Sequence, residues 1–376
     1  MRTLQVYRDH FNILPGGIER HVHELAHGLR PEVETEVLVA ARARSSSTHM
    51  DGDVPVHLSA ELGRFQGVPF CPRFQSVMSA GNYDVIHLHS PNPTGEIASR
   101  LARTNAARVA TYHATSDRAA KVPLYHSLLY STMRSCARVL ASSERLIEAT
   151  PLLRRLRDER PAAIRVVPFG VDLDRFHPGE TEGSRHFRER WGPGPIVLFL
   201  GRLRYYKGLE HLIRALTPLD AKFVMIGEGL ERGRVENLAR SLLGERFVYH
   251  PVMTDPEIAD AYRAADLFCL PSTSSAEAFG LAAVEAMASG LPVITTEVGT
   301  ATSVVNQDSD TGLVVPPRDE RALRGAISTL LGDKETARQM GKAARVRAEE
   351  NYDRRVMFER ITAIYREAAR ECRDRR

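Results

Sequence analysis

Two glutamates lie eight residues apart in a small-residue stretch, SSAEAFGLAAVEAMASG (274–290). If a helix begins near Gly280, Glu277 lies in the loop before it and Glu285 lies inside it. In a continuous helix the two would be ~12 Å apart along the axis and ~80° apart around it, too far to act as one carboxylate dyad. They can instead contact an extended ligand at two points while the helix start faces a phosphate. The alternative is structural: one acid favoured by the helix dipole and one on a solvated face.

Two cations follow a predicted strand in FLGRLRYYKGLEHL (199–212). Arg202 is a bidentate donor and Lys207 a point charge, and together they suit a diphosphate. Lysine is rare in this chain, since only five of the 51 basic residues are lysines. We therefore interpret the pair as a diphosphate site. Solvated surface charge is the alternative.

Two glycine-rich turns follow other predicted strands. Gly16 and Gly17 precede a helical pattern, where free backbone N–H groups can face an anion, although an ordinary tight turn fits as well. MIGEGLERG (225–233) nearly matches the dinucleotide fingerprint, but Gly233 comes one residue late. The following strand, RFVYHP, ends without the acidic residue that would hold a ribose, so we reject an NAD site. A turn beside a nucleobase or ribose, or a plain turn, remains open.

Histidines are concentrated at the front of the chain, with 11 of the 14 before residue 181. His87 and His89 alternate on one predicted strand and so face the same side. They could ligate a metal, but no third ligand is evident, so we interpret them as polar side chains that line a cleft. His113 ends the strand RVATYH, where a catalytic side chain would project.

Asp172 and Asp174 form a D-x-D that could hold a cation, but local turn formation is the favoured interpretation.

The elements that must position these residues alternate between β-branched runs and amphipathic helices such as 17–29 and 209–219. The predicted strands are 3–7, 35–40, 85–89, 108–113, 138–143 and 164–170, then 195–201, 221–227, 246–251, 266–271, 291–296 and 311–317. Such alternation predicts an α/β protein with parallel sheets covered on both faces. Two series indicate two doubly wound, Rossmann-like domains that meet near 168–187 and face a central cleft at the carboxyl ends of their strands.

Composition excludes several classes of protein. The chain has 376 residues, 43% of them hydrophobic, with a formal net charge of +4 and a pI near 8.9. That charge gives no strong case for nucleic acid. The four cysteines have no metal-ligand spacing, and we expect free thiols in a reducing cytoplasm. Without a signal peptide or an apolar run long enough to span a bilayer, the sequence predicts a cytoplasmic protein.

The stretch around the glutamates, EAFGLAAVEAMASGLPVI, resembles the signature of retaining glycosyltransferases of family 4, which have the GT-B fold. The likeness extends over nearly the whole chain through PGGIERHVHELA, HLHSPNPTGE, TYH, PFGVD, GRLRYYKG, IGEG and TGLVVPP. Within the family, TEVGTATSVVNQ and LHSPNP most resemble the rhamnosyl/mannosyltransferase branch. One departure is ATSDRAAK after His113, where relatives place a Ser-Asp pair directly after the histidine. This leaves acceptor identity open.

The resemblance implies roles for the site residues. Glu277 would bind the donor sugar's hydroxyls and Glu285 the ribose, while Arg202 and Lys207 neutralise the diphosphate without a metal ion. His113 would contact the transferred sugar. The other residues expected at the substrates are Gly16, Gly17, His89, Gly227, Glu228, Val252, Ala278, Phe279, Gly280 and Leu281. The acceptor would attack from the leaving-group side, with retention and without an assigned protein nucleophile.

The resemblance further implies an acceptor-binding domain at 1–172, a donor-binding domain at 173–355 and a C-terminal helix at 356–376 that crosses back. We expect transfer of a hexose, with mannose from GDP-mannose favoured, to a hydroxyl of a glycan, glycolipid or small molecule, with no cofactor. The alternatives are a UDP-sugar-dependent transferase, an epimerase or phosphorylase of the same fold, and a nucleotide-sugar binding protein. The arginine-rich stretch 133–165 could also dock on anionic lipid near a lipid-linked acceptor, or be a solvated face.

Overall fold

The computed structural model describes residues 1–10, 16–30, 32–65, 67–113 and 123–374. The chain forms two compact units, one of residues 1–168 with 355–376 and one of residues 169–354. Residues 169–172 thus join the second unit and Arg355 the first, a small difference from the predicted boundaries. The reason lies in the backbone: Val171 N–H donates to Tyr352 O at 2.8 Å, and Arg354 N–H donates to Val171 O at 3.1 Å.

The first unit is built on one sheet with the strand order β10-β9-β8-β7-β1-β2-β4-β3. All neighbouring strands are parallel except the β3–β4 hairpin at one edge. The strands are β1 (Arg2–Val6), β2 (Glu34–Ala40), β3 (Ser47–Asp51), β4 (Val54–Ser59), β7 (Val85–Ser90), β8 (Ala107–Tyr112), β9 (Arg138–Ala141) and β10 (Ile164–Val166). A separate hairpin pairs β5 (Gly63–Phe65) with β6 (Val68–Phe70).

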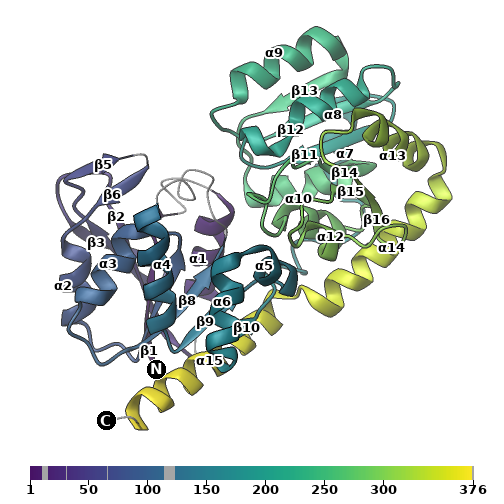
Figure 1. Cartoon of the computed structure of the whole chain (residues 1–376). Coiled ribbons are helices and arrows are strands. Elements are labelled where there is room, and N and C mark those ends of the chain that lie inside the picture. The colour runs from purple at the N-terminus through teal and green to yellow at the C-terminus, as the bar shows by residue number, and fades with distance from the viewer. Residues whose placement is uncertain (11–15, 31, 66, 114–122, 375–376) are drawn as a thin grey trace. The chain divides into compact units, whose positions relative to one another are not determined.

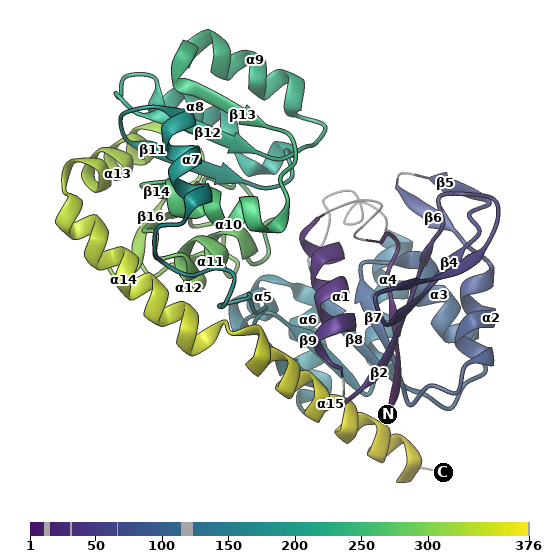
Figure 2. The same ribbon diagram turned by 180° about the vertical axis from the view of Figure 1, so that it is seen from behind.

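Helices cover both faces of this sheet. They are α1 (Gly17–Gly28), α2 (Arg73–Ala80), α3 (Pro93–Leu101), α4 (Pro123–Ser135), α5 (Glu144–Ala149), α6 (Pro151–Glu159) and α15 (Arg354–Asp374). Figures 1 and 2, seen from opposite sides, show α3 and α4 over one face and α1 over the other. Helix α1 buries Val22, Leu25 and Ala26, the i, i+3, i+4 pattern of an amphipathic helix, and Val22 and Ala26 join a core cluster with Val37 and Val56. Burying each large side chain contributes about 1.5–3 kcal/mol.

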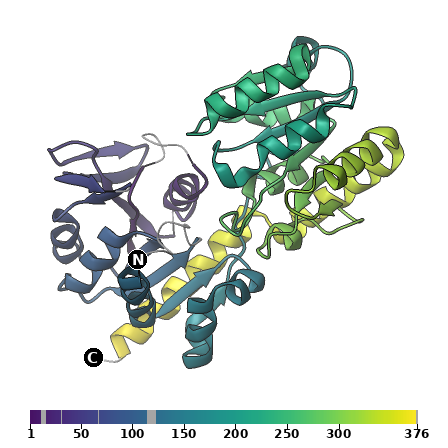
Figure 3. The ribbon, with the colours of Figure 1, turned by 45° about the horizontal axis from the view of Figure 1, so that its top comes forward.

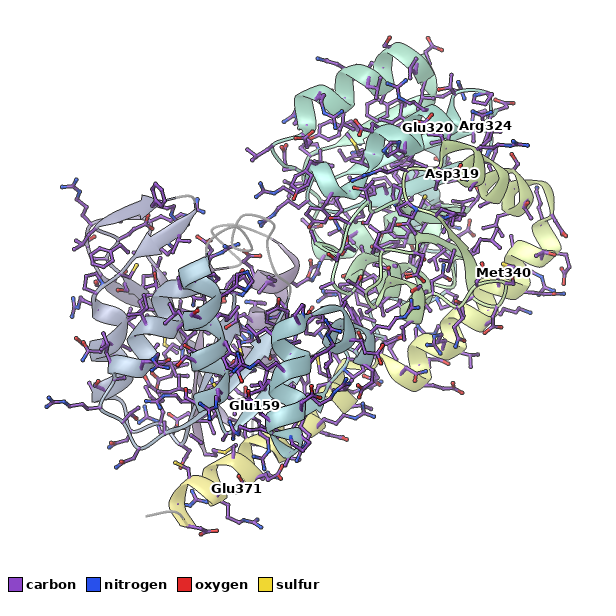
Figure 4. The ribbon with its side chains drawn as sticks, viewed as in Figure 1. Glu159, Asp319, Glu320, Arg324, Met340 and Glu371 are labelled. Atoms are coloured by element: carbon purple, nitrogen blue, oxygen red, sulfur yellow. The ribbon has the colours of Figure 1, made fainter. Side chains whose placement is uncertain are left out.

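Helix α15 belongs to the first unit from Arg355 onward. Its buried side chains include Tyr365, whose hydroxyl accepts a hydrogen bond from Gln5 Nε2 at 3.0 Å. Near its end, Glu371 (labelled in Figure 4) accepts a hydrogen bond from Arg138 Nη1 at 3.0 Å. Arg138 lies at the start of β9, so this ion pair fastens the end of the chain to the sheet.

The second unit has the strand order β13-β12-β11-β14-β15-β16, all parallel, which is the doubly wound order of a dinucleotide-type fold. The strands are β11 (Ile196–Leu200), β12 (Lys222–Ile226), β13 (Phe247–His250), β14 (Leu267–Leu270), β15 (Val293–Thr296) and β16 (Gly312–Val315). The run IVLFL of β11 is apolar throughout, as a strand buried on both faces requires.

The helices of the second unit are α7 (Glu182–Trp191), α8 (Leu209–Leu216), α9 (Arg232–Leu243), α10 (Asp255–Ala264), α11 (Leu281–Ala288), α12 (Thr302–Val305), α13 (Glu320–Gly332) and α14 (Lys334–Asn351). Figure 3 shows α13 and α14, in yellow-green, side by side. The predicted α/β class with two Rossmann-like domains is therefore confirmed, and each of the twelve predicted strands overlaps an observed one. Strands β3, β4, β5 and β6 were not predicted.

Candidate donor site and histidine network

The candidate donor site lies at the point in the second sheet where the strand order reverses. From β11 the chain adds β12 and β13 on one side, then returns to place β14 on the other. The loops that leave β11 and β14 therefore diverge, and ligands of such folds bind between them at the carboxyl ends of the strands. The backbone N–H of Thr273, after β14, donates to Tyr206 O, after β11, at 2.7 Å. The predicted cations and Glu277 stand on these two loops.

Lys207 and Glu277 form a buried ion pair across the two loops. Lys207 lies on a short 3₁₀ helix (Tyr205–Lys207), and its Nζ donates to Glu277 Oε2. Each side chain is only 10% exposed. Burial is the largest single effect and acts to lower the pKa of Lys207. The charge of Glu277, the charge of Tyr206 and the hydrogen bond to Glu277 together outweigh it, so the pKa is raised above its ordinary value. Lys207 is therefore a charged ammonium with three donors, one of which is occupied by Glu277.

Two hydroxyl groups, from residues that follow β14 and β15, hold Glu277 in place. Ser272 Oγ donates to Glu277 Oε2 at 3.0 Å, and Thr300 Oγ1 donates to the Glu277 backbone oxygen. Both hydroxyls are fully or nearly fully buried. The carboxylate is held in place before any ligand binds, which is what a group that must recognise sugar hydroxyls requires. Neither hydroxyl was predicted from the sequence.

Helix α11 begins where the sequence predicted. Its N-cap Gly280 has φ +85° and offers no side-chain cap. Within the described part of the chain, the backbone N–H groups of Phe279, Gly280 and Leu281 find no hydrogen-bond acceptor. Three donors at a helix start form the kind of site that accepts a phosphate. Ala278 lies directly before them and is buried, and its carbonyl accepts from Ala301 N–H at 3.2 Å.

Glu285 lies inside α11, eight residues after Glu277. Its side chain is buried, and Tyr262 OH donates to Glu285 Oε2 at 2.9 Å. The segment before Gly280 is not helical, so the separation expected for a continuous helix does not apply. The prediction that one acid precedes the helix and the other lies within it is confirmed.

Close backbone packing explains the glycines after β11 and β12. Gly227 has φ +135°, and a Cβ there would lie 2.1 Å from the Gly201 carbonyl oxygen. The two loops are further joined by Leu203 N–H, which donates to Glu228 O at 2.8 Å. Gly227 therefore serves to bring two turns together at the edge of the site.

The remaining predicted residues of this unit lie on the same rim. Tyr249 OH donates to Glu228 Oε1 at 3.0 Å, and Arg232 pairs with Glu228 at 2.9 Å. Val252, after β13, is 68% exposed. Arg202 is half-buried two residues beyond the end of β11.

In the first unit, α1 begins at Gly17 after the loop that leaves β1. The chain reverses its strand order between β1 and β7, so this loop borders the second switch point. A Cβ placed on Gly17 meets nothing within 4 Å, and Gly16 has an extended backbone with no side-chain cap for the helix. The helix begins where the sequence predicted, and residues 11–15 of the loop before it lie outside the described residues. The segment ATSDRAAK lies outside the described residues.

The histidines of the first unit form one buried hydrogen-bonded network. Gln5 Nε2 can only donate, so the Tyr365 hydroxyl that accepts from it donates in turn to His87 Nδ1 at 2.5 Å. His87 Nε2 then donates to Thr111 Oγ1 at 2.7 Å. On the other side, His89 Nε2 donates to Gln5 Oε1 at 3.0 Å.

This network fixes the tautomer of His113. Since His89 uses Nε2 to donate, its Nδ1 accepts from His113 Nε2 at 3.0 Å, which leaves Nδ1 of His113 as the acceptor atom. Burial lowers the pKa of His87 to about 3, and it lowers the pKa of His89 and His113 well below the ordinary value. All three imidazoles are therefore neutral.

Two interpretations of these histidines require correction. His87 and His89 do face the same side, with ring centroids 4.3 Å apart, but both are completely buried and do not line a cleft. Both ring nitrogens of His89 bond within the unit, so His89 supports His113 from behind and is not itself a substrate contact. Among the described residues, His21, His89 and His113 have ring nitrogens within 4.8 Å of one another, a group that includes His89 but not His87.

Asp172 forms a local turn, as the favoured interpretation predicted. Its Oδ1 accepts from the backbone N–H groups of Asp174 and Arg175, both at 3.2 Å. Its Oδ2 pairs with Arg354 at 2.7 Å. The Asp172 carboxylate is thus fully engaged, and its ion pair joins the first residues of the second unit to Arg354, the last residue of that unit.

The described residues contain no helix that is both long and apolar enough to cross a membrane. In the arginine-rich stretch 133–165, Arg155 pairs with Glu159 at 2.9 Å and Arg160 donates to Cys136 O at 2.9 Å. These contacts and the Arg138 pair occupy part of the basic charge. Docking of this stretch on anionic lipid stays a prediction.

Comparisons with known proteins identify the family of the chain. Residues 184–347 match the family model for glycosyl transferases group 1, and residues 15–175 match the model for glycosyltransferase family 4. The D-rhamnosyltransferase WbpZ of Pseudomonas aeruginosa is 31% identical over 353 residues, which cover 92% of this chain and 91% of that one. The O-antigen chain mannosyltransferase C of Escherichia coli is 28% identical over 373 residues, 97% of this chain and 98% of that one.

Solved structures share the fold. Sucrose-phosphate synthase from Thermosynechococcus elongatus has a TM-score of 0.82 at 23% identity, over 97% of this chain and 98% of that one. Anabaena HepE in complex with UDP and glucose has a TM-score of 0.78 at 21% identity, over 97% and 99%. From its two sheets, its donor-site geometry and these relatives, we conclude that the chain is an enzyme that belongs to the GT-B glycosyltransferases of family 4.

Proposed function

We propose that this chain is a metal-independent, retaining mannosyltransferase that moves mannose from GDP-mannose to a hydroxyl of a glycan, glycolipid or small-molecule acceptor. The buried Lys207–Glu277 pair carries the proposal, since it sets a fixed cation beside a fixed carboxylate at the switch point. The choice of mannose is supported by the names of relatives, which include the Escherichia coli mannosyltransferase and a phosphatidyl-myo-inositol mannosyltransferase of Mycobacterium leprae, 27% identical over 378 residues.

In the proposed reaction, the bond between the anomeric carbon and the diphosphate oxygen breaks. A bond from the acceptor hydroxyl forms on the same face of the sugar, and the hydroxyl proton passes to the departing phosphate oxygen. Lys207 keeps one N–H on Glu277 and gives another to the diphosphate, with Arg202 as the second cation. Each charge-assisted contact of this kind contributes about 1.5–3 kcal/mol. Positioning and charge stabilisation of the leaving group supply most of the rate.

The other predicted residues take the remaining parts of the donor. Glu277 binds sugar hydroxyls, Glu285 binds the ribose, and the N-terminus of α11 receives a phosphate. From the first unit, neutral His113 contacts the transferred sugar through a hydrogen bond. Asp172 takes no part, because its carboxylate is engaged by Arg354 and by two backbone amides.

The test compares Glu277→Ala with Glu245→Ala, an exposed glutamate of the same unit. Glu277→Ala should abolish mannosyl transfer while GDP binding and the fold survive, and Glu245→Ala should retain full turnover. Unchanged turnover in Glu277→Ala would disprove the site. Transfer should also persist in EDTA. A loss in EDTA that Mg²⁺ or Mn²⁺ restores would contradict a metal-independent reaction.

A UDP-sugar is the second candidate donor, because HepE, which shares the fold, was solved in complex with UDP-glucose. A calorimetric screen of GDP-, UDP-, dTDP- and ADP-sugars separates the candidates. Tight preference for a UDP-sugar would overturn the mannosyl assignment and leave the transferase assignment in place. Donor hydrolysis without any acceptor, or dependence on inorganic phosphate, would instead favour an epimerase or phosphorylase.

A further inference from the structure

Three histidines of the first unit converge on one carboxylate oxygen that the proposed transfer reaction does not use. Asp51 Oδ2 lies 3.2 Å from His23 Nδ1, 3.5 Å from His27 Nε2 and 3.6 Å from His10 Nε2. The donor atoms of His10, His23 and Asp51 all lie within 4.8 Å of one another. From this geometry we propose that these four residues bind a divalent transition-metal ion of the Zn²⁺ class.

Two of the three distances fit metal coordination better than hydrogen bonding. Zn–N and Zn–O bonds of about 2.0–2.2 Å place two ligands of a tetrahedral ion about 3.3–3.6 Å apart. The distances from Asp51 Oδ2 to His27 and His10, 3.5 and 3.6 Å, match that edge, and the distance to His23, 3.2 Å, is slightly shorter. Good N–H···O hydrogen bonds lie at about 2.7–3.2 Å, shorter than the two longer distances. A single carboxylate oxygen also cannot accept three of them well.

The local sequence explains why these donors meet. His23 and His27 are four positions apart in HELAH, so they lie on one face of α1, the spacing of the H-E-x-x-H zinc motif. Asp51 ends β3 in the edge hairpin, and His10 follows β1 by four residues. Three separate segments therefore supply the ligands, and an ion would tie the edge hairpin and the loop after β1 to α1.

The ligand types suit a metal. Zn²⁺ is bound in proteins by imidazole nitrogens and carboxylate oxygens, and the three histidines and Asp51 supply both kinds of ligand.

The site is a structural one. His10, His23 and Asp51 supply three ligand atoms within 4.8 Å of one another, and His27 Nε2, 3.5 Å from Asp51 Oδ2, is the proposed fourth ligand. With four protein ligands no position is left open for a water or substrate, which is typical of structural zinc. Glu24, the residue that would act as base in an H-E-x-x-H enzyme, pairs with Arg20 at 3.4 Å. All four ligands belong to the first unit, whereas Arg202 and Lys207 belong to the second. The proposal is thus independent of the donor site and of the transfer reaction.

Calorimetric titration of the EDTA-treated, dialysed full-length protein with ZnCl₂ tests the site. The wild type should bind one Zn²⁺ and unfold at a higher temperature in its presence. Asp51→Asn and His23→Gln should each weaken binding at least tenfold and lose the thermal shift. Asp53→Asn, an exposed aspartate in the turn of the same hairpin, is the matched control and should bind as the wild type does.

A second control addresses the other histidine group, His21, His89 and His113. His113→Gln should leave the zinc affinity unchanged. Absence of Zn²⁺ binding by the wild type, equal affinity in Asp51→Asn and His23→Gln, or a loss confined to His113→Gln would each overturn the proposal. Circular dichroism of every variant checks that it is folded. If Asp51→Asn does not fold, His23→Gln alone decides the test.

Discussion

The buried pair of Lys207 and Glu277 makes a quantitative prediction about the second unit. Lys207→Met removes the ammonium and leaves a buried carboxylate whose remaining hydroxyl donor is Ser272. Breaking a buried ion pair by removing one partner costs about 3–5 kcal/mol of the free energy of unfolding. Both side chains are 10% exposed, so solvent screening reduces that figure little. Glu277→Gln, which leaves the ammonium buried, should cost a similar amount.

The double variant gives the sharper result. Lys207→Met with Glu277→Gln removes both charges and keeps the side-chain volumes, a change that is often near neutral. We expect it to lose no more stability than either single variant, which gives a coupling energy of about 3 kcal/mol or more. Stability is measured by urea unfolding followed through Trp191 fluorescence. Trp191 is the only tryptophan, is 2% exposed and stacks on Phe187 within the second unit, so its signal reports that unit.

The pH dependence follows from the direction of the Lys207 pKa shift. A base whose pKa is raised on folding contributes stability that is fully present below its unfolded pKa, about 10.4, and is lost as pH rises through the folded value. The wild type should therefore lose stability above that pH more steeply than Lys207→Met. The reasoning would be refuted if each single variant lowered the free energy of unfolding by less than about 1 kcal/mol and the two losses were additive in the double variant. Exposed ion pairs behave in that way.

Three further predictions concern the loops and the histidine network. Gly227→Ala should lose more than about 2 kcal/mol by Trp191-monitored unfolding, because its Cβ meets the backbone at φ +135°, while the control Gly233→Ala in α9 should be neutral or stabilising. Tyr365→Phe should cost about 1–3 kcal/mol and change the His87 tautomer seen by ¹⁵N NMR; an unchanged tautomer would contradict the network. Below pH 6.5 the first unit should lose stability, because His21 and His87, with pKa values lowered to about 3, take up protons on unfolding, at up to about 1.36 kcal/mol per pH unit each. Hydrogen exchange in 85–113 that does not change with pH, after correction for intrinsic rates, would contradict this.

The sequence predicted the parallel strands because their apolar runs are buried on both faces, as in IVLFL and KFVMI. It did not predict β3, whose residues STHMD are mostly exposed and lack an apolar alternation. β3 forms because it pairs with β4 at the edge of the sheet. This pairing depends on tertiary structure and cannot be predicted from the local sequence pattern of β3.

The site residues show the same limit. Lys207 and Glu277 were each predicted from position, but their pairing across 70 residues depends on β11 and β14 being neighbours. Ser272 could have been found, because it directly follows the strand predicted to end at 271. The contact between Gln5 and Tyr365 joins residues 360 apart, and no local signal in either segment points to the other.

Calorimetric binding of GDP-mannose in the presence of EDTA tests the central claim most directly. Wild-type protein should bind one GDP-mannose, and Lys207→Met should bind about 10- to 150-fold more weakly, because one charge-assisted contact of about 1.5–3 kcal/mol is lost. Glu245→Ala should bind as the wild type does. Equal affinity in Lys207→Met, or binding that appears only when Mg²⁺ or Mn²⁺ replaces EDTA, would contradict a metal-independent donor site at the switch point of the second sheet.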